Sequence, residues 1–217
     1  MIDAVIFDMD GLLIDSEPIW AEAEVKVFNG VGVPLTREMT TQTTGLRTDE
    51  VVHHWHRLFP WDSPTQQEVA QHIDELVIEL IKEKGEAKQG VAEAIEACES
   101  LKLPMAIASS SPDELINTVL EKLGIKDKMQ VIHSAHDEAF GKPHPAVYIS
   151  TAHELGVHPT HCLTFEDSAN GVLSAKAARM KCIAIPEPGM RNDKRFGIAD
   201  IILHSLSDFS VEMLEDW

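Results

Sequence analysis

Cysteines are scarce in this sequence. Three are present among 217 residues, at Cys98, Cys162 and Cys182, and no two form a CxxC pair. An odd and sparse set of this kind is typical of free core thiols in a reducing compartment. We therefore expect three unpaired, buried thiols.

Long apolar runs and basic leader segments are also missing. The chain begins MIDAVIFD, which has no basic region ahead of an apolar one, and no stretch has the length of a membrane span. Secretion and membrane insertion are therefore not expected. We predict a cytoplasmic protein with no membrane partner.

Basic residues are outnumbered two to one. The chain has 18 Lys and Arg against 36 Asp and Glu, a net charge of −18. Such a surface repels polyanions, so sequence-independent binding of nucleic acid is not expected. A small anionic substrate can bind to such an acidic protein only if a metal ion and a few basic side chains make the electrostatic potential positive at the binding site.

What remains is the composition of an ordinary globular protein, with 44% hydrophobic and 25% charged residues. The length suffices for one sizeable core, or for one core and a small insert. No internal repeat, low-complexity tract or long linker marks a boundary. The domain organisation must therefore come from the pattern of strands and helices.

A short apolar strand and a long helical stretch open the chain. Residues 3–7 (DAVIF) predict a buried strand that ends at Asp8. The helices predicted next are 17–29 with Ser16 as N-cap, one after Thr48, and one from Thr65 to about Lys84, where Thr65 and Glu68 form a capping box. No convincing strand interrupts these helices.

Strands and helices alternate after Gly90. The predicted helices are 91–101, one opened by Ser111 as N-cap and closed by Gly124, 145–155 closed by Gly156, and 169–178; the predicted strands are 104–109, 130–133, 162–165 and 181–185. This alternation favours a mostly parallel, doubly wound sheet. We predict an α/β fold: a Rossmann-like, mostly parallel sheet core (1–14 and 83–217) with an inserted all-α cap domain (15–82).

Asp8 and Asp10 follow the first strand directly, in the sequence DMDG. Ligands of open α/β sheets bind at this end of the strands. Two carboxylates one residue apart can divide the work, one binding Mg²⁺ and attacking phosphorus, the other acting as general acid and base. Gly11 allows a sharp turn that frees a carbonyl oxygen. A structural polar turn is the alternative; a calcium loop lacks the required ligand spacing.

Three further features stand at the ends of later strands. Ser109, Ser110 and Ser111 lie at a strand–helix junction that suits phosphate oxygens, or simply caps the helix. Lys142, in GKPHP, is held in a turn and can neutralise a phosphoryl group, although most lysines are surface charges. The strand CLTF runs into Glu166-Asp167-Ser168, which offers further oxygen ligands for Mg²⁺ or another helix cap at Ser168.

These four features together resemble the haloacid dehalogenase superfamily. Its hDxDG motif, its Ser or Thr, its Lys and its acidic pair correspond here to 6–11, Ser109, Lys142 and Glu166-Asp167. The resemblance covers essentially the whole chain, and the position of the insert is similar to the cap of the phosphoglucomutase-like subgroup. The second aspartate, Asp10, favours the superfamily's phosphatases over its dehalogenases.

The resemblance implies in-line attack on phosphorus by Asp8, with Asp10 as general acid and then general base. It implies a Mg²⁺ ion, for which Mn²⁺ or Co²⁺ can substitute, bound by Asp8, Asp10 and Asp167 together with Glu166. Ser109, Ser110 and Lys142 are expected to hold the phosphoryl oxygens. Catalysis of this kind rests on positioning and electrostatic stabilisation.

Within the superfamily the main alternative is a β-phosphoglucomutase. The mutases carry a histidine ten residues after the second aspartate, where this chain has Trp20, and this difference favours hydrolysis. Arg47, in TTGLR, matches a cap arginine that contacts the distal end of the substrate, although a surface arginine is also plausible. DMDGLLIDSEP, TGLR, ASSSP and KPHP are similar to bacterial 2-deoxyglucose-6-phosphate and hexitol-phosphate phosphatases.

We therefore predict a small phosphorylated substrate, a hexose or hexitol monophosphate, and a monomeric enzyme. A non-catalytic Mg²⁺- or phosphate-binding regulatory protein is the rival from another class, and it is expected to lack one of the catalytic residues. A receiver-like signalling domain also phosphorylates an aspartate, but has no cap. The histidines of 53–56 suggest zinc, yet no cysteine or acid has matching spacing, so an amphipathic helix is favoured.

Overall fold

The apolar run 3–7 forms the central strand of a parallel sheet. In the computed structural model, which describes residues 1–214 and 217, six strands pair in the order β3-β2-β1-β4-β5-β6. Their bounds are β1 Ala4–Phe7, β2 Met105–Ser109, β3 Val131–Ser134, β4 Cys162–Glu166, β5 Lys181–Ala184 and β6 Ile201–Ile202. The predicted α/β, Rossmann-like fold is thus confirmed.

Eight α-helices accompany the sheet in the described part of the chain. They are α1 Glu17–Gly30, α2 Arg37–Thr40, α3 Thr48–Leu58, α4 Gln66–Lys84, α5 Val91–Ser100, α6 Asp113–Leu123, α7 Ala146–Leu155 and α8 Ala169–Ala177. Short 3₁₀ turns are η1 Lys126–Lys128, η2 Ala135–Asp137, η3 Pro159–His161, η4 Lys194–Ile198, η5 Leu206–Asp208 and η6 Val211–Leu214. The sequence pattern did not predict α2 or β6.

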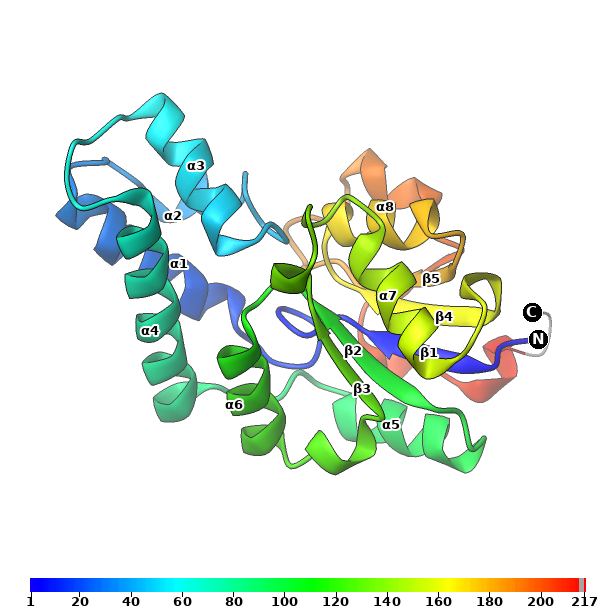
Figure 1. The fold of residues 1–217 in the computed structure, drawn as a ribbon. Helices are drawn as coiled ribbons and strands as arrows, with labels where there is room; N and C mark the ends of the chain where they lie inside the picture. Colours follow the sequence, from blue (N-terminus) through cyan, green and yellow to red (C-terminus); the bar gives the residue numbers. More distant parts are fainter. Residues whose placement is uncertain (215–216) are drawn as a thin grey trace.

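Alternate residues of the strands face two different helical layers. Val5 and Phe7 belong to the hydrophobic cluster that α5 and α6 cover, whereas Ala4 and Ile6 belong to the cluster that α7 and α8 cover. This is the period-two alternation of a strand buried on both faces. Figure 1 shows these two pairs of helices on opposite sides of the sheet.

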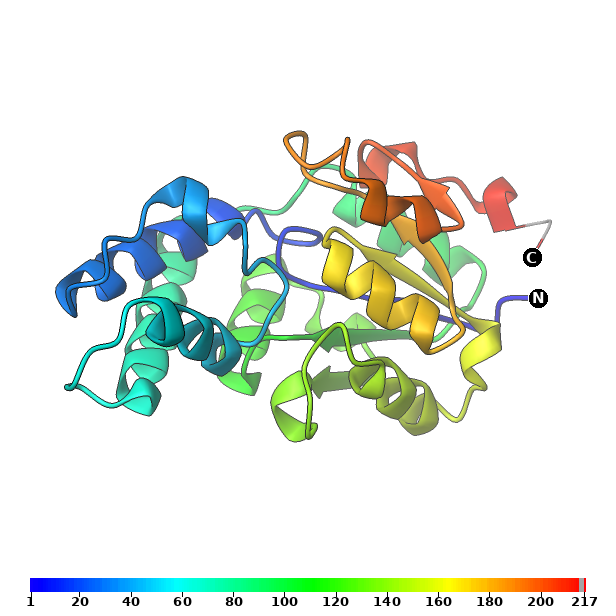
Figure 2. The same cartoon turned by 90° about the horizontal axis from the view of Figure 1, so that it is seen from above.

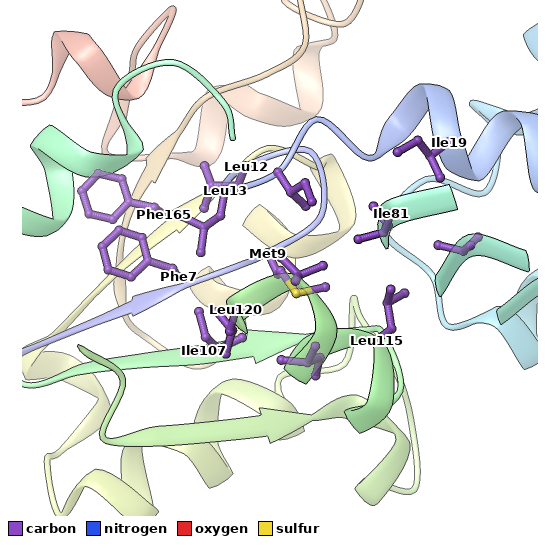
Figure 3. Close-up of a cluster of buried hydrophobic side chains, with 14 of the residues drawn as sticks. Phe7, Met9, Leu12, Leu13, Ile19, Ile81, Ile107, Leu115, Leu120 and Phe165 are labelled. Atoms are coloured by element: carbon purple, nitrogen blue, oxygen red, sulfur yellow. The ribbon is translucent and has the colours of Figure 1, made fainter. Parts of the chain in front are cut away.

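The core continues from the sheet into the helices that follow β1. The rings of Phe7 and Phe165 stack with a centroid distance of 5.1 Å. Figure 3 shows this pair, and Met9 of the next loop lying toward Leu115 of α6. Ile19 of α1 and Ile81 of α4 belong to the same buried cluster. The loop that carries DMDG is therefore fixed by apolar packing on both sides.

Helices α1 to α4 form the insert between β1 and β2. They occupy residues 17–84, pack mainly on one another, and contain no strand among the described residues. Figures 1 and 2 place them beyond the carboxyl ends of the strands, with both chain termini at the opposite end. The boundaries of the cap at 15–82 stay a prediction; α4 extends two residues past it.

Most of the predicted helix ends are confirmed, but the cap predicted at Ser111 is wrong. Thr65 and Glu68 form the expected capping box, and Ser168 accepts a hydrogen bond from the Gly171 N–H. Ser16 is the N-cap residue of α1, as predicted, although its side chain makes no capping hydrogen bond, and Pro112, not Ser111, is the N-cap of α6. Both hydroxyls are engaged elsewhere, by one carboxylate of the candidate site.

The three cysteines are free and buried, as expected. Burial raises the pKa of Cys98 to about 12, so this thiol stays protonated at neutral pH. Across the described residues, no helix combines the length and the apolar character needed to cross a membrane.

Candidate active site

The ends of three neighbouring strands bring the predicted residues to one edge of the sheet. Phe7 of β1 pairs in register with Ile107 of β2 and Phe165 of β4. The Asp8 N–H donates to the Phe165 carbonyl at 3.0 Å, which extends the ladder by one residue. Asp8 and Glu166 therefore emerge side by side at the carboxyl edge of the sheet.

Lys142 is the buried cation of this edge. It lies in the loop before α7, its side chain is 1% exposed, and its Nζ donates to Asp8 Oδ1 and to Glu166 Oε1, each at 2.6 Å. The Ala108 carbonyl accepts a further bond at 3.0 Å. The hydroxyl of Tyr148 on α7 also donates to Glu166. These contacts fix the ammonium group against the predicted nucleophile.

Burial sets the charge balance of this group. Burial raises the pKa of Asp8 to about 8, although Lys142 partly offsets the effect. The pKa of Lys142 is lowered by burial but raised further by Asp8 and Glu166, and it ends above its ordinary value. Burial, and then the charges of Asp8 and Glu166, hold the pKa of Asp167 well above its usual range. Acidic groups are thus in excess over cations here.

Asp8, Glu166 and Asp167 can hold a hard cation. One oxygen from each lies within 4.8 Å of the others, and all three residues are buried. Such an all-oxygen set suits Mg²⁺, Mn²⁺ or Ca²⁺. Three carboxylates against one ammonium leave two negative charges, which a divalent cation balances. The residues therefore fit the expected metal ion.

The three acids differ in how far they are already engaged. Glu166 accepts from Lys142 and Tyr148 through Oε1, and Ser168 donates to its Oε2. The described residues donate no hydrogen bond to the Asp167 carboxylate. A Cβ on Gly11, whose φ is +73°, would lie 2.1 Å from Asp167 Oδ2. Gly11 therefore gives Asp167 room beside the DMDG loop.

Asp10 is held by three side chains that the sequence reasoning did not assign to it. Oδ1 accepts from the Ser16 hydroxyl at 2.7 Å and from the Trp20 indole Nε1 at 2.8 Å. Oδ2 accepts from the Ser111 hydroxyl at 2.7 Å. Charge-assisted bonds of this kind fix both oxygens of a carboxylate. Asp10 is therefore a separate, positioned group, distinct from the Asp8–Lys142 pair.

The three consecutive serines have different surroundings. Ser109 is fully buried, and its hydroxyl accepts from the Ser111 N–H at 3.1 Å. Ser110 and Ser111 line a cavity together with Asp8, Asp10 and Lys142. The Ser110 hydroxyl donates to the Gly45 carbonyl of the insert at 2.9 Å. The serine end of β2 thus borders both the acidic edge and the insert.

This cavity lies between the sheet edge and the insert. Its core wall carries the two aspartates, Lys142, Asp167 and the serines, and its other wall comes from α1, the 40–46 segment and the start of α3. Asn170 Nδ2 donates to the Thr44 carbonyl at 3.0 Å, a second polar contact between insert and core. The insert thus covers the cavity.

Arg47 lies outside the residues that line this cavity. Its Nη1 donates to the carbonyl oxygens of Ala135 and Glu138, at 3.1 and 2.9 Å, and its Nη2 pairs with Asp49 at 3.0 Å. In this arrangement Arg47 joins insert and core. A contact between Arg47 and the substrate stays a prediction, and it requires these bonds to break.

The histidines at 53–56 belong to the insert, not to a metal site. His56 packs edge-on against Trp61 and its Nε2 bonds the Trp61 carbonyl at 3.1 Å, while His54 packs against Trp55. The one group of potential metal ligands found over residues 1–214 and 217 is Asp8, Glu166 and Asp167.

Comparison with known proteins places the chain in a family. A family profile described as "Haloacid dehalogenase-like hydrolase" matches residues 5–185, and the chain belongs to this family. It is 42% identical to hexitol phosphatase B of Escherichia coli (strain K12) over 212 residues, which are 97% of this chain and 96% of that protein. The resemblance inferred from the motifs is thereby confirmed.

Two further relatives extend the comparison. The chain is 30% identical to the phosphorylated carbohydrates phosphatase of Thermotoga maritima over 185 residues, 84% of each chain. The crystal structure of β-phosphoglucomutase from Clostridium difficile superposes with a TM-score of 0.88, covers 100% of this chain and 96% of that one, and is 23% identical. At 23% identity, the similarity to this mutase concerns the fold alone.

Sequence reasoning missed Ser16, Trp20 and Tyr148 as members of the site, and for Ser111 it missed the hydrogen bond to Asp10. Ser111 and Ser16 were assigned to helix caps, which a Ser at a helix start generally indicates. Trp20 was noted only as a difference from the mutases. Tyr148 is the single tyrosine of the chain and lies six residues after Lys142, in the first turn of α7. Its closeness to Lys142 in the sequence could have indicated a role in the site, but its hydrogen bond to Glu166 could not be read from the sequence.

Proposed function

We propose that this protein is a magnesium-dependent phosphatase that hydrolyses small sugar or sugar-alcohol monophosphates through a phospho-Asp8 intermediate. One observation carries the proposal: among the carboxylates that line a single cavity, Asp8 and Asp10 are held by separate sets of partners. Lys142 fixes Asp8, and other donors fix Asp10. A nucleophile and a general acid–base need this separation, because each must act in its own step.

In the first step an Asp8 oxygen forms a bond to phosphorus while the bond from phosphorus to the ester oxygen breaks. Asp10 gives its proton to that leaving oxygen. In the second step Asp10 takes a proton from water as the water cleaves the acyl phosphate. Inorganic phosphate leaves, and Asp8 is a carboxylate again.

The phosphoryl oxygens are held by Lys142, the Ser109 hydroxyl and the Ser110 N–H in this proposal. Asp8, the Asp10 carbonyl and Asp167 would hold Mg²⁺, and Glu166 would contribute mainly by fixing Lys142. The bound Mg²⁺ supplies positive charge that offsets the repulsion between an anionic phosphate and these carboxylates. The expected use of Mn²⁺ or Co²⁺ instead follows from the same all-oxygen donors.

The substrate class is supported by the relatives. The names of the Escherichia coli and Thermotoga maritima proteins describe phosphatases of hexitol phosphates and of phosphorylated carbohydrates. A covered cavity whose insert wall carries threonine, glutamate and tryptophan side chains suits a compact polyol better than a large nucleotide. Hydrolysis is favoured over a mutase reaction, because Trp20 occupies the position of the mutase histidine and binds Asp10.

The test is a phosphate-release screen over sugar, polyol, nucleotide and small-acid phosphates with the wild type and Asp8→Asn. We expect Mg²⁺-dependent release from hexose or hexitol phosphates, stopped by EDTA and restored by added Mg²⁺. Asp8→Asn should release no phosphate from any substrate, whereas the exposed control Asp3→Asn should match the wild type. Undiminished turnover by Asp8→Asn would disprove the mechanism, and a flat substrate profile would disprove the substrate class.

A further inference from the structure

Glu24 is a buried carboxyl group that the proposed reaction does not use. It lies on α1, is 6% exposed, and lines the cavity between insert and core. Its Oε2 has no hydrogen-bond partner within the described part of the chain. A buried polar atom without a hydrogen-bond partner destabilises the folded protein, so a functional role could explain why it is there.

The position of Glu24 places it away from the reacting groups. Glu17, Trp20 and Glu24 share the cavity face of α1, at helical spacings of three and four residues. Trp20 reaches Asp10, and Figure 1 shows α1 running outward from the sheet edge. Because a helix rises about 1.5 Å per residue, Glu24 lies roughly 6 Å further from the core than Trp20. Glu24 is thus placed on the part of the cavity wall that is distal to the Asp8–Asp10 edge.

The wall around Glu24 carries no positive charge. Among the described lining residues Lys142 is the sole Lys or Arg, and it is already paired with Asp8 and Glu166. Thr43 and Thr48, each 3% exposed, add hydroxyl groups to the same wall. A second phosphate group placed here would be buried without a counter-charge, which is strongly unfavourable.

We propose that Glu24 determines specificity by hydrogen-bonding hydroxyl groups at the distal end of the substrate, and that its cation-free wall excludes substrates with a second phosphate there. This inference rests on the proposed phosphatase function and names the substrate feature that the insert recognises. A polyol hydroxyl both donates and accepts, so it satisfies the carboxyl group whether that group is protonated or ionised.

The state of the carboxyl group agrees with this recognition. Burial, reinforced by the charge of Glu17, raises the pKa of Glu24 to about 8. The group is therefore mainly neutral at pH 7, with one O–H donor and one acceptor oxygen. The hydroxyl groups of a polyol offer this carboxyl group both a hydrogen-bond acceptor and a donor, whereas an alkyl chain offers neither.

The experiment compares a hexitol 6-phosphate with n-hexyl phosphate, which has the same number of carbons but no hydroxyl groups. For the wild type we expect KM to be about 10- to 100-fold lower for the hexitol ester than for hexyl phosphate. This factor corresponds to one or two hydrogen bonds between Glu24 and the substrate hydroxyl groups. Glu24→Leu should raise KM for the hexitol ester by a similar factor. It should leave kcat, and KM for hexyl phosphate, nearly unchanged, because the contact is made equally before and during the reaction.

A matched control is Glu22→Leu, an exposed position on the same helix that forms a surface pair with Lys84. It should keep the wild-type KM for both substrates. Glu24→Leu also replaces an unsatisfied buried carboxyl group by an apolar one, so it should unfold at a temperature no lower than the wild type. Kinetic effects can then be assigned to the substrate contact.

Several outcomes would overturn the inference alone. They are an unchanged KM for the hexitol ester in Glu24→Leu, an equal loss for both esters, and wild-type turnover of a hexitol 1,6-bisphosphate as efficient as that of the monophosphate. If the wild type released no phosphate from any of these compounds with Mg²⁺ present, the proposed function itself would fall, and this inference with it.

Discussion

The contact between Trp20 and Asp10 gives the sharpest prediction about catalysis. Replacing Trp20 by Phe keeps an aromatic ring and removes the indole N–H that Asp10 Oδ1 accepts at 2.8 Å. An indole nitrogen only donates, so this bond keeps Oδ1 unprotonated, and the catalytic proton has to be carried on Oδ2. There the Ser111 hydroxyl, which can rotate, can accept it. We therefore expect Trp20→Phe to misplace the general acid and leave the nucleophile intact.

The expected magnitude follows from the type of bond. A hydrogen bond to a charged group contributes about 1.5–3 kcal/mol, which corresponds to a loss of roughly 10- to 100-fold in kcat/KM. Ser16 and Ser111 still hold the carboxylate, so the loss should lie toward the lower end of this range. This loss applies to esters whose leaving oxygen needs a proton, such as hexitol phosphates.

The assay compares a hexitol phosphate with 4-nitrophenyl phosphate. Nitrophenolate leaves without protonation, and kcat/KM reports only the steps up to its departure, so Trp20→Phe should lower kcat/KM for the aryl ester by less than about 3-fold. The control is Trp61→Phe, which loses an indole hydrogen bond of the same length, to the Pro64 carbonyl at 2.8 Å, away from the cavity. Equal losses on both esters, or no loss on the hexitol ester, would refute the positioning role of Trp20.

Three further predictions concern the charges. Lys142→Met should lower the free energy of unfolding in urea by about 3–5 kcal/mol and abolish turnover, because it leaves the carboxylates of Asp8 and Glu166 buried without their shared counter-charge; a change below about 1 kcal/mol would contradict this. The melting temperature of Glu24→Gln, relative to that of the wild type, should increase as pH rises from 5 to 8. The folded protein keeps a proton on Glu24 up to a pKa of about 8, whereas the unfolded chain loses it near 4.5, so the wild type loses stability across this window; a pH-independent difference would count against it. Added Mg²⁺ should raise the melting temperature more at pH 8 than at pH 6, because protons compete for Asp8, whose pKa is raised to about 8; a larger gain at pH 6 would disprove metal binding by this residue.

The sequence predicted the backbone frame because that frame is encoded locally. Apolar runs of four or five residues gave β1, β2, β4 and β5 within a residue or two, and the caps at Thr65, Gly124 and Gly156 marked helix ends. Strand β6 was not predicted because it has two residues, too few to show a hydrophobic periodicity. Once parallel strands were predicted, Asp8, Lys142 and Glu166 had to approach one edge.

The partners of those residues could not be predicted, because they come from segments far apart in the chain. Asp10 and Ser111 are 101 positions apart and meet through one hydrogen bond. A serine before a helix predicts a cap, and only the packing of α6 against the DMDG loop assigns its hydroxyl to a carboxylate. The direction of Arg47, toward two core carbonyls and away from the cavity, likewise depends on how insert and core meet.

The sequence by itself therefore determined the fold, and it predicted Asp8 as nucleophile, Asp10 as acid–base and Lys142 as the cation beside them, since motif order and strand ends are local properties. The tertiary structure decided what holds these groups and what faces the substrate: Trp20 on Asp10 and the unpartnered carboxyl group of Glu24 in a covered wall. The physical reason is that burial and hydrogen-bond partners depend on which surfaces meet. That is settled only when α1 packs over the carboxyl edge of the sheet.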